Sequence, residues 1–183
     1  ENIFCRSFKG ERFIVKDKSI KKIQDLGKIL RKLHKNGFDN AYKIYLEILR
    51  YWKIDRKDRN RRFKILSTKE LDSLNKDVGG SVGKQFLLFL TPNLSTKTIS
   101  KIAISYGKAI KCADNLSDIN DDLARGYINI SKEDLKKYKL FIKRKGQKLT
   151  IINRDLRKYE ELELKKIGLM LKKAHNITNL IIK

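Results

Sequence analysis

Apolar residues recur at helical spacing along most of the chain from Ser19 onward. A first stripe ends near Gly37, and a second begins after Asp39 and reaches Trp52, with apolar residues at every third or fourth position. The basic stretch over residues 56–62 interrupts the pattern, and we interpret it as a solvated connection. The first third of the chain therefore predicts two helices.

The rest of the chain predicts four more helices. Ser67 and Glu70 have the spacing of a capping box, which opens a helix that runs to about residue 91. A second helix is expected over residues 95–125, where a glycine follows in the position of a C-terminal stop. A short helix after Ser131 and a long helix from about residue 154 complete the pattern.

Length and composition are typical of one helical domain. The chain has 183 residues, of which 40% are hydrophobic, and this is enough to bury a single core. We find no repeat, no low-complexity linker and no convincing strand, with residues 149–152 as a short extended piece at most. These observations predict an all-α, single-domain helical bundle over residues 1–183.

The chain is strongly basic, with 44 Lys and Arg against 21 Asp and Glu and a formal net charge of +23. Such a charge attracts polyanions, namely nucleic acid, an anionic membrane or a phosphorylated metabolite, although biased codon usage explains it equally well. Cys5 and Cys112 do not make a disulfide framework, and no apolar run is long enough to span a bilayer. We therefore expect a cytoplasmic protein, with association at a membrane surface as the alternative. Because Glu1 is not an initiator methionine, we also expect the chain to be part of a longer one.

Three glycines, Gly79, Gly80 and Gly83, lie inside the helix predicted over residues 67–91. Each costs about 1 kcal/mol relative to alanine in a helix, so another interaction must offset the cost. Two interpretations remain open. The glycines allow a kink or close helix–helix packing, or they leave room for a ligand chain.

Asp114, Asp118 and Asp122 follow one another at intervals of four residues near the end of the helix predicted over residues 95–125. This spacing places them within a sector of about 80° and a length of about 12 Å, with Asp121 at its border. Like charges repel at this spacing, and the end of the helix is already partly negative. Mg²⁺ would relieve the repulsion because it prefers oxygen ligands. The alternative is an exposed acidic helix end whose negative charge balances the basic surface elsewhere.

At these residues the sequence resembles the squalene/phytoene synthase family of head-to-head prenyl transferases. The second aspartate-rich helix of that family reads Asn or Asp, three residues, Asp, two residues, Glu or Asp, then Asp, followed by Arg-Gly. Residues 114–126 read DNLSDINDDLARG. Residues 78–83 read VGGSVG and resemble the family's Val-Ala-Gly-x-Val-Gly segment, which opens the prenyl-chain pocket. The similarity covers about residues 63–140.

The resemblance implies a class I isoprenoid synthase-like bundle of helices around a central cavity. It implies a Mg²⁺-dependent enzyme that condenses two prenyl diphosphates, with Asp118 and Asp122 as catalytic residues. NADPH is compatible with the resemblance, but no residue indicates it. The metal would be bound by Asp114, Asp118, Asp121 and Asp122. The substrate would be bound by Gly79, Gly80, Val82 and Gly83, and Lys111 and Arg125 are candidate diphosphate partners because of their charge.

The sequence also departs from the family pattern. Lys111 replaces a usual glutamine, Ser117 replaces an arginine, and the family's first aspartate-rich motif would lie at or before Glu1. Two alternatives therefore stay open beside the enzyme. One is a catalytically inactive relative, and the other is a basic helical protein that binds nucleic acid, although no known nucleic-acid motif is present.

Overall fold

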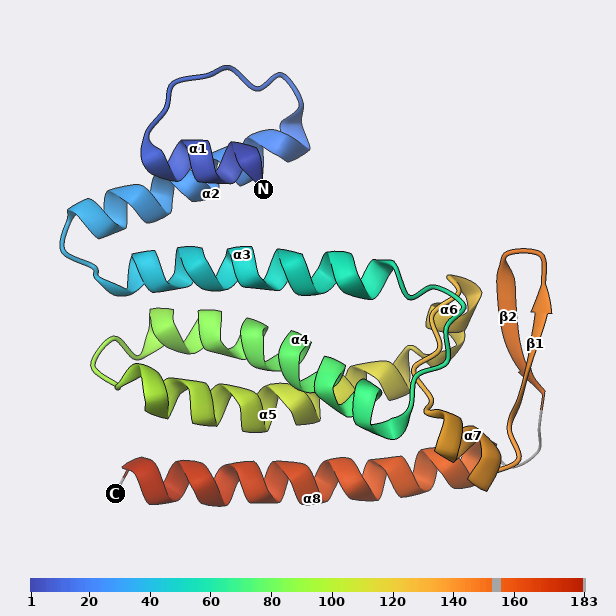
Figure 1. The fold of residues 1–183 in the computed structure, drawn as a ribbon. Helices are drawn as coiled ribbons and strands as arrows, with labels where there is room; N and C mark the ends of the chain where they lie inside the picture. Colours follow the sequence, from blue (N-terminus) through green and yellow to red (C-terminus); the bar gives the residue numbers. More distant parts are fainter. Residues whose placement is uncertain (153–155, 183) are drawn as a thin grey trace.

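The computed structural model describes residues 1–152 and 156–182, which form eight helices and one two-stranded sheet (Figure 1). The protein is therefore mostly helical, as the hydrophobic pattern predicts. The elements are α1 (Asn2–Lys9), α2 (Lys18–Lys35), α3 (Asn40–Arg59), α4 (Thr68–Leu90), α5 (Thr96–Ser117), α6 (Ile119–Ala124), α7 (Lys132–Lys137), β1 (Phe141–Lys145), β2 (Lys148–Ile152) and α8 (Leu156–Ile182).

Six helices pack in the order α1, α2, α3, α4, α5 and α8, each against the next. Figure 1 shows α3 on one side of the α4–α5 pair and α8 on the other, while α6, α7 and the hairpin gather at one end. No helix in the described ranges is long and apolar enough to cross a membrane.

A first core joins α1 to α3 and reaches the far ends of α4 and α5. The ring of Phe4 is fully buried, stacks on Tyr45 at 5.2 Å and meets Trp52 edge-on at 5.0 Å. Leu88 and Ile99 are fully buried in the same core. The sequence did not predict α1, because a helix of eight residues gives too few repeats to establish a period.

A second core lies at the other end of the molecule and includes the hairpin. Its buried apolar residues are Ile119, Leu123, Ile128, Ile130, Tyr138, Leu140, Leu149 and Tyr159. The strands are antiparallel, and their register pairs Phe141 with Ile152 and Lys145 with Lys148. The prediction of no convincing strand is therefore wrong, since the short extended piece at residues 149–152 belongs to β2. The strands form because Leu149, on their inner face, packs into this core.

The glycines of α4 allow α4 and α5 to approach closely. A Cβ atom on Gly79 would lie 1.9 Å from the carbonyl oxygen of Gly107, a separation that no side chain tolerates. A Cβ on Gly80 would lie 3.1 Å from Ile104, and one on Gly83 would lie 3.2 Å from the Ala103 carbonyl oxygen. The structure thus supports close helix–helix packing as the reason for the glycines.

The helix predicted over residues 95–125 is interrupted. α5 ends at Ser117, Asp118 adopts φ −98° and ψ 13°, and α6 begins at Ile119. The hydrogen bonds from Asp118 N to Asp114 O (2.9 Å) and from Asp122 N to Asp118 O (2.8 Å) continue across the break. The chain bends rather than unwinds here, and the bend coincides with the burial of Ile119 in the second core.

Candidate functional site

A groove of about 560 Å³ runs along the contact between α4 and α5. The helices around it contribute mainly apolar and aromatic side chains, from Tyr51, Val78, Val82, Phe86, Ala103, Tyr106 and Ile110. Lys111 and Asp114 are the last α5 residues to line it, so they mark one end. The groove is therefore an apolar channel with charged groups at one end.

The groove is open to solvent along part of its length. The side chains of Phe86 and Ile110 are 65% and 62% exposed, although both are large and apolar. Contiguous apolar surface of this kind marks an interaction site more often than a free surface.

The substrate-binding residues predicted from the sequence do not all meet in this groove. Gly79, Val82 and Gly83 line it together with Lys111. Gly80 faces Ile104 and is not among the lining residues. Arg125 is also outside the groove, at the end of α6, where its carbonyl oxygen accepts a hydrogen bond of 2.9 Å from Arg62 Nε.

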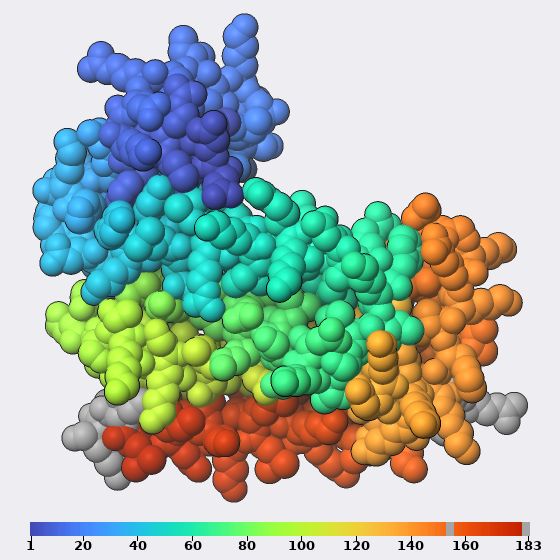
Figure 2. Space-filling model, viewed as in Figure 1, coloured from blue at the N-terminus to red at the C-terminus, as the bar shows by residue number. Residues whose placement is uncertain are grey.

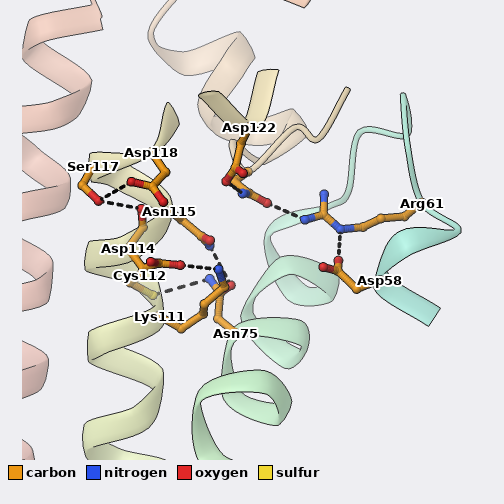
Figure 3. A network of polar contacts seen from close by, with 11 residues as sticks. Asp58, Arg61, Asn75, Lys111, Cys112, Asp114, Asn115, Ser117, Asp118 and Asp122 are labelled. Atoms are coloured by element: carbon orange, nitrogen blue, oxygen red, sulfur yellow. Dashed lines mark hydrogen bonds and ion pairs between the residues drawn. The ribbon is translucent and has the colours of Figure 1, made fainter. Parts of the chain in front are cut away.

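The carboxylates of Asp114 and Asp118 lie on the surface of the C-terminal part of α5 (Figure 3). Asp114 Oδ2 is 2.5 Å from Lys111 Nζ, and Asp118 Oδ1 accepts a hydrogen bond of 3.0 Å from Ser117 Oγ. Asp121 is exposed as well. The acidic stripe is therefore largely exposed, and only Asp122 is partly buried.

Asp122 belongs to a chain of polar contacts that the sequence did not predict. Asn129 Nδ2 donates to Asp122 Oδ2 at 2.5 Å, and Arg61 Nη2 donates to Asn129 Oδ1 at 2.5 Å. Arg61 also donates to the carbonyl oxygen of Ile128 at 3.1 Å and forms an ion pair with Asp58. Figure 3 shows this guanidinium between Asp58 and the Asp122 region.

The basic stretch over residues 56–62 is only partly the solvated connection that the pattern predicted, because most of it is exposed but it is helical at its start and includes one buried side chain. α3 continues to Arg59, and Arg61 is only 8% exposed. A buried arginine is rare unless it is paired. Here the partners are Asp58 in α3 and two residues of the loop after α6, Ile128 and Asn129. The only signal in the sequence was a run of basic residues, and such a run gives no indication of which member is buried.

Burial raises the pKa of the Asp122 carboxyl above its ordinary value. Lys111 and the hydrogen bond from Asn129 lower this pKa, whereas Asp118 and Asp114 raise it further. The three carboxylates therefore interact electrostatically, even though only one of them is partly buried.

The donor set fits a Mg²⁺ ion only in an open arrangement. In the described part of the chain, no three His, Cys, Asp or Glu side chains are close enough together to hold a metal by themselves. Mg²⁺ commonly takes one or two protein carboxylates and completes its shell with water and substrate phosphates. Asp114 and Asp118, exposed and one turn apart, suit that arrangement.

A second, polar cleft of about 200 Å³ lies on the opposite side of α5, toward α8. Asn115 Nδ2 donates to Asn75 Oδ1 at 2.8 Å, while the buried Oδ1 of Asn115 has no hydrogen-bond partner among the residues that the structure describes. Asn75 Nδ2 in turn lies 3.5 Å from Cys112 Sγ, and burial raises the pKa of that thiol. Cys112 is therefore a half-buried thiol whose surroundings disfavour the thiolate, as its place in an apolar helix suggests.

Comparison of the chain with protein-family models, with characterised proteins and with solved structures finds no match. The resemblance of residues 78–83 and 114–126 to the squalene/phytoene synthase family stays a prediction. Function must be inferred from the groove, the carboxylates beside it and the charge of the chain.

Proposed function

We propose that the protein is a Mg²⁺-dependent prenyl transferase that condenses two prenyl diphosphates. The apolar chain of a substrate lies in the α4–α5 groove, and its diphosphate lies at Lys111 and Asp114. One observation supports this most directly: the apolar groove ends at a cation, Lys111, and at Asp114, the first carboxylate of the acidic stripe. The groove would form one wall of the central cavity that a class I isoprenoid synthase-like fold implies.

The size and lining of the groove suit a prenyl chain. Its volume of about 560 Å³ is within the usual range for ligand sites, and burying each CH₂ group contributes about 0.8 kcal/mol. Val82, Phe86 and Ile110 offer apolar contacts along the groove. Tyr51 and Tyr106 line it too, and aromatic rings stabilise positive charge that develops nearby on an allylic chain.

The charged end of the groove suits a diphosphate. The ammonium group of Lys111 can pair with phosphate oxygens, and Asp114 and Asp118 would hold Mg²⁺ together with water and the substrate. The ion, when bound, neutralises the diphosphate as it leaves. Asp122, which accepts a hydrogen bond from Asn129, would lie outside this pair of ligands, since no three such side chains among the described residues are close enough together to hold a metal.

Binding of an unreactive thio-analogue of farnesyl diphosphate, measured by titration calorimetry with and without Mg²⁺, tests this proposal. We expect binding that depends on Mg²⁺ and that weakens at least about tenfold in the double variant D114N and D118N, since each lost charge-assisted contact contributes on the order of 1.5 kcal/mol. Asp25→Asn on α2, which removes an exposed carboxylate away from the groove, serves as the matched control. Binding that does not depend on Mg²⁺, or that is equally tight in the double variant, would contradict the proposal.

Product analysis with farnesyl and geranylgeranyl diphosphate separates an enzyme from an inactive relative. An enzyme releases diphosphate and forms a joined hydrocarbon product, whereas an inactive relative binds the analogue and forms none. The ion pair between Lys111 and Asp114 is the observation that favours the inactive relative, because it occupies a carboxylate that Mg²⁺ would need.

A further inference from the structure

The hairpin and the residues before it form a segment that is rich in basic residues and contains no acidic residue. Residues 135–152 contain no Asp or Glu, and their seven basic residues are Lys136, Lys137, Lys139, Lys143, Arg144, Lys145 and Lys148. Nothing within the segment neutralises this charge.

The two faces of the hairpin differ in character. Successive residues of a strand point to opposite faces, so the register places residues 141, 143, 145, 148, 150 and 152 on one face. The other face carries Leu149, which is buried, and Ile142 and Ile151, which pack against the second core. The first set of residues therefore forms the outer face of the hairpin.

The outer face combines an apolar pair with a cluster of lysines. Phe141 and Ile152 are directly opposite each other, and they are 67% and 52% exposed. Lys143, Lys145 and Lys148 follow on the same face toward the turn, and all three are exposed. Figure 2 shows the hairpin, in orange, at the rim of the molecule with side chains that project outward.

We propose that the outer face of the hairpin docks on an anionic lipid surface. Phe141 and Ile152 would enter the boundary between headgroups and acyl chains, where exposed apolar side chains are stabilised. The lysines would lie among anionic headgroups, and each contributes roughly fivefold to the affinity. The net charge of +23 brings the protein to such a surface from any direction.

A nucleic acid is the competing partner for a basic two-stranded ribbon, because the major groove of DNA admits one. A phosphate backbone, however, offers no apolar contact for the exposed Phe141–Ile152 pair. The apolar pair beside the lysines therefore favours the membrane surface. This inference does not depend on the function proposed for the groove.

Flotation with lipid vesicles tests the inference on the full chain. We expect binding to vesicles with about one-third phosphatidylserine and little binding to pure phosphatidylcholine. The variant K143Q, K145Q and K148Q should lose roughly a hundredfold in affinity. The matched control K18Q, K21Q and K22Q, which removes the same charge from exposed positions of α2, should lose much less.

The variant F141S and I152S distinguishes the two partners. We expect it to weaken vesicle binding about tenfold or more, because it removes the apolar insertion but no charge. Vesicle binding that is unchanged in this variant, or equal losses in the two lysine variants, would overturn the proposal. Duplex DNA binding that outcompetes vesicles and depends on the hairpin lysines would overturn it in favour of a nucleic-acid surface. Circular dichroism of each variant confirms that the helices are intact.

Discussion

Asp122 is the one partly buried carboxylate of the acidic stripe formed by Asp114, Asp118 and Asp122. Burial raises its pKa, so the folded protein holds the Asp122 proton more tightly than the unfolded chain does. Its contribution to stability is therefore complete below the pKa of the unfolded state and is lost as the pH rises through the higher pKa of the folded state.

Asp122→Asn should remove this loss of stability at higher pH, because the amide is neutral at every pH and can still accept the hydrogen bond from Asn129. We expect the variant to melt at a higher temperature than the natural protein at pH 7, and the difference to shrink toward pH 3. Thermal unfolding in a chelating buffer across this range measures it. A difference in Tm that does not vary with pH would show that the Asp122 charge is not its cause.

Asn75 and Asn115 form a buried pair of amides. One hydrogen bond joins them, but Asn115 Oδ1 has no hydrogen-bond partner among the described residues. Asn115→Leu leaves Asn75 Oδ1 without a donor and should cost about 1–3 kcal/mol of unfolding free energy. Asn75→Leu and Asn115→Leu together should cost less than the sum of the two single changes, because no orphaned amide remains. Urea unfolding of the four proteins measures the coupling, and simple additivity would show that the two amides do not depend on each other.

Between elements, the closest contact is that of α4 with α5 at Gly79 and Gly107. Gly79→Ala improves helix propensity by about 1 kcal/mol, but the new Cβ would collide with the backbone of α5. We expect a net loss of several kcal/mol, of the order seen for overpacked cores. Gly168→Ala in α8 is the matched control, because no atom outside the local helix lies within 4 Å of its Cβ position. The control should gain about 1 kcal/mol, and urea unfolding that ranks the two variants in the opposite order would refute the packing explanation.

The elements that the sequence predicted are those with local signals. The capping box is confirmed, with Ser67 N donating to Glu70 Oε2 at 2.8 Å and Glu70 N to Ser67 Oγ at 3.3 Å. The sequence did not predict β1, because its exposed basic residues show no alternation of apolar and polar positions. Its conformation depends on pairing with β2 and on contacts with a core formed by distant parts of the chain. The acidic positions of the candidate site could be found from spacing alone. Their surroundings could not, because Arg61 and Asn129 are 68 residues apart in the chain.

For the whole molecule, the dominant long-range force is repulsion among like charges. The net charge of +23 favours expansion of the chain, and salt screens this repulsion over a Debye length of about 10 Å at 0.1 M. We expect Tm to rise as sodium chloride increases from about 20 to 200 mM. Differential scanning calorimetry measures the shift, and a Tm that falls with salt would mean that attractive ion pairs outweigh the repulsion.

The position of Trp52 against Phe4 has an optical consequence. Trp52 is the only tryptophan in the chain, and it belongs to the core that joins α1 to α3. The opposite core contains Tyr138 and Tyr159 but no tryptophan. Emission from the indole therefore reports on the first of these regions alone. If the two cores melt separately, the unlabelled protein will reveal it as a fluorescence transition that does not coincide with the loss of ellipticity.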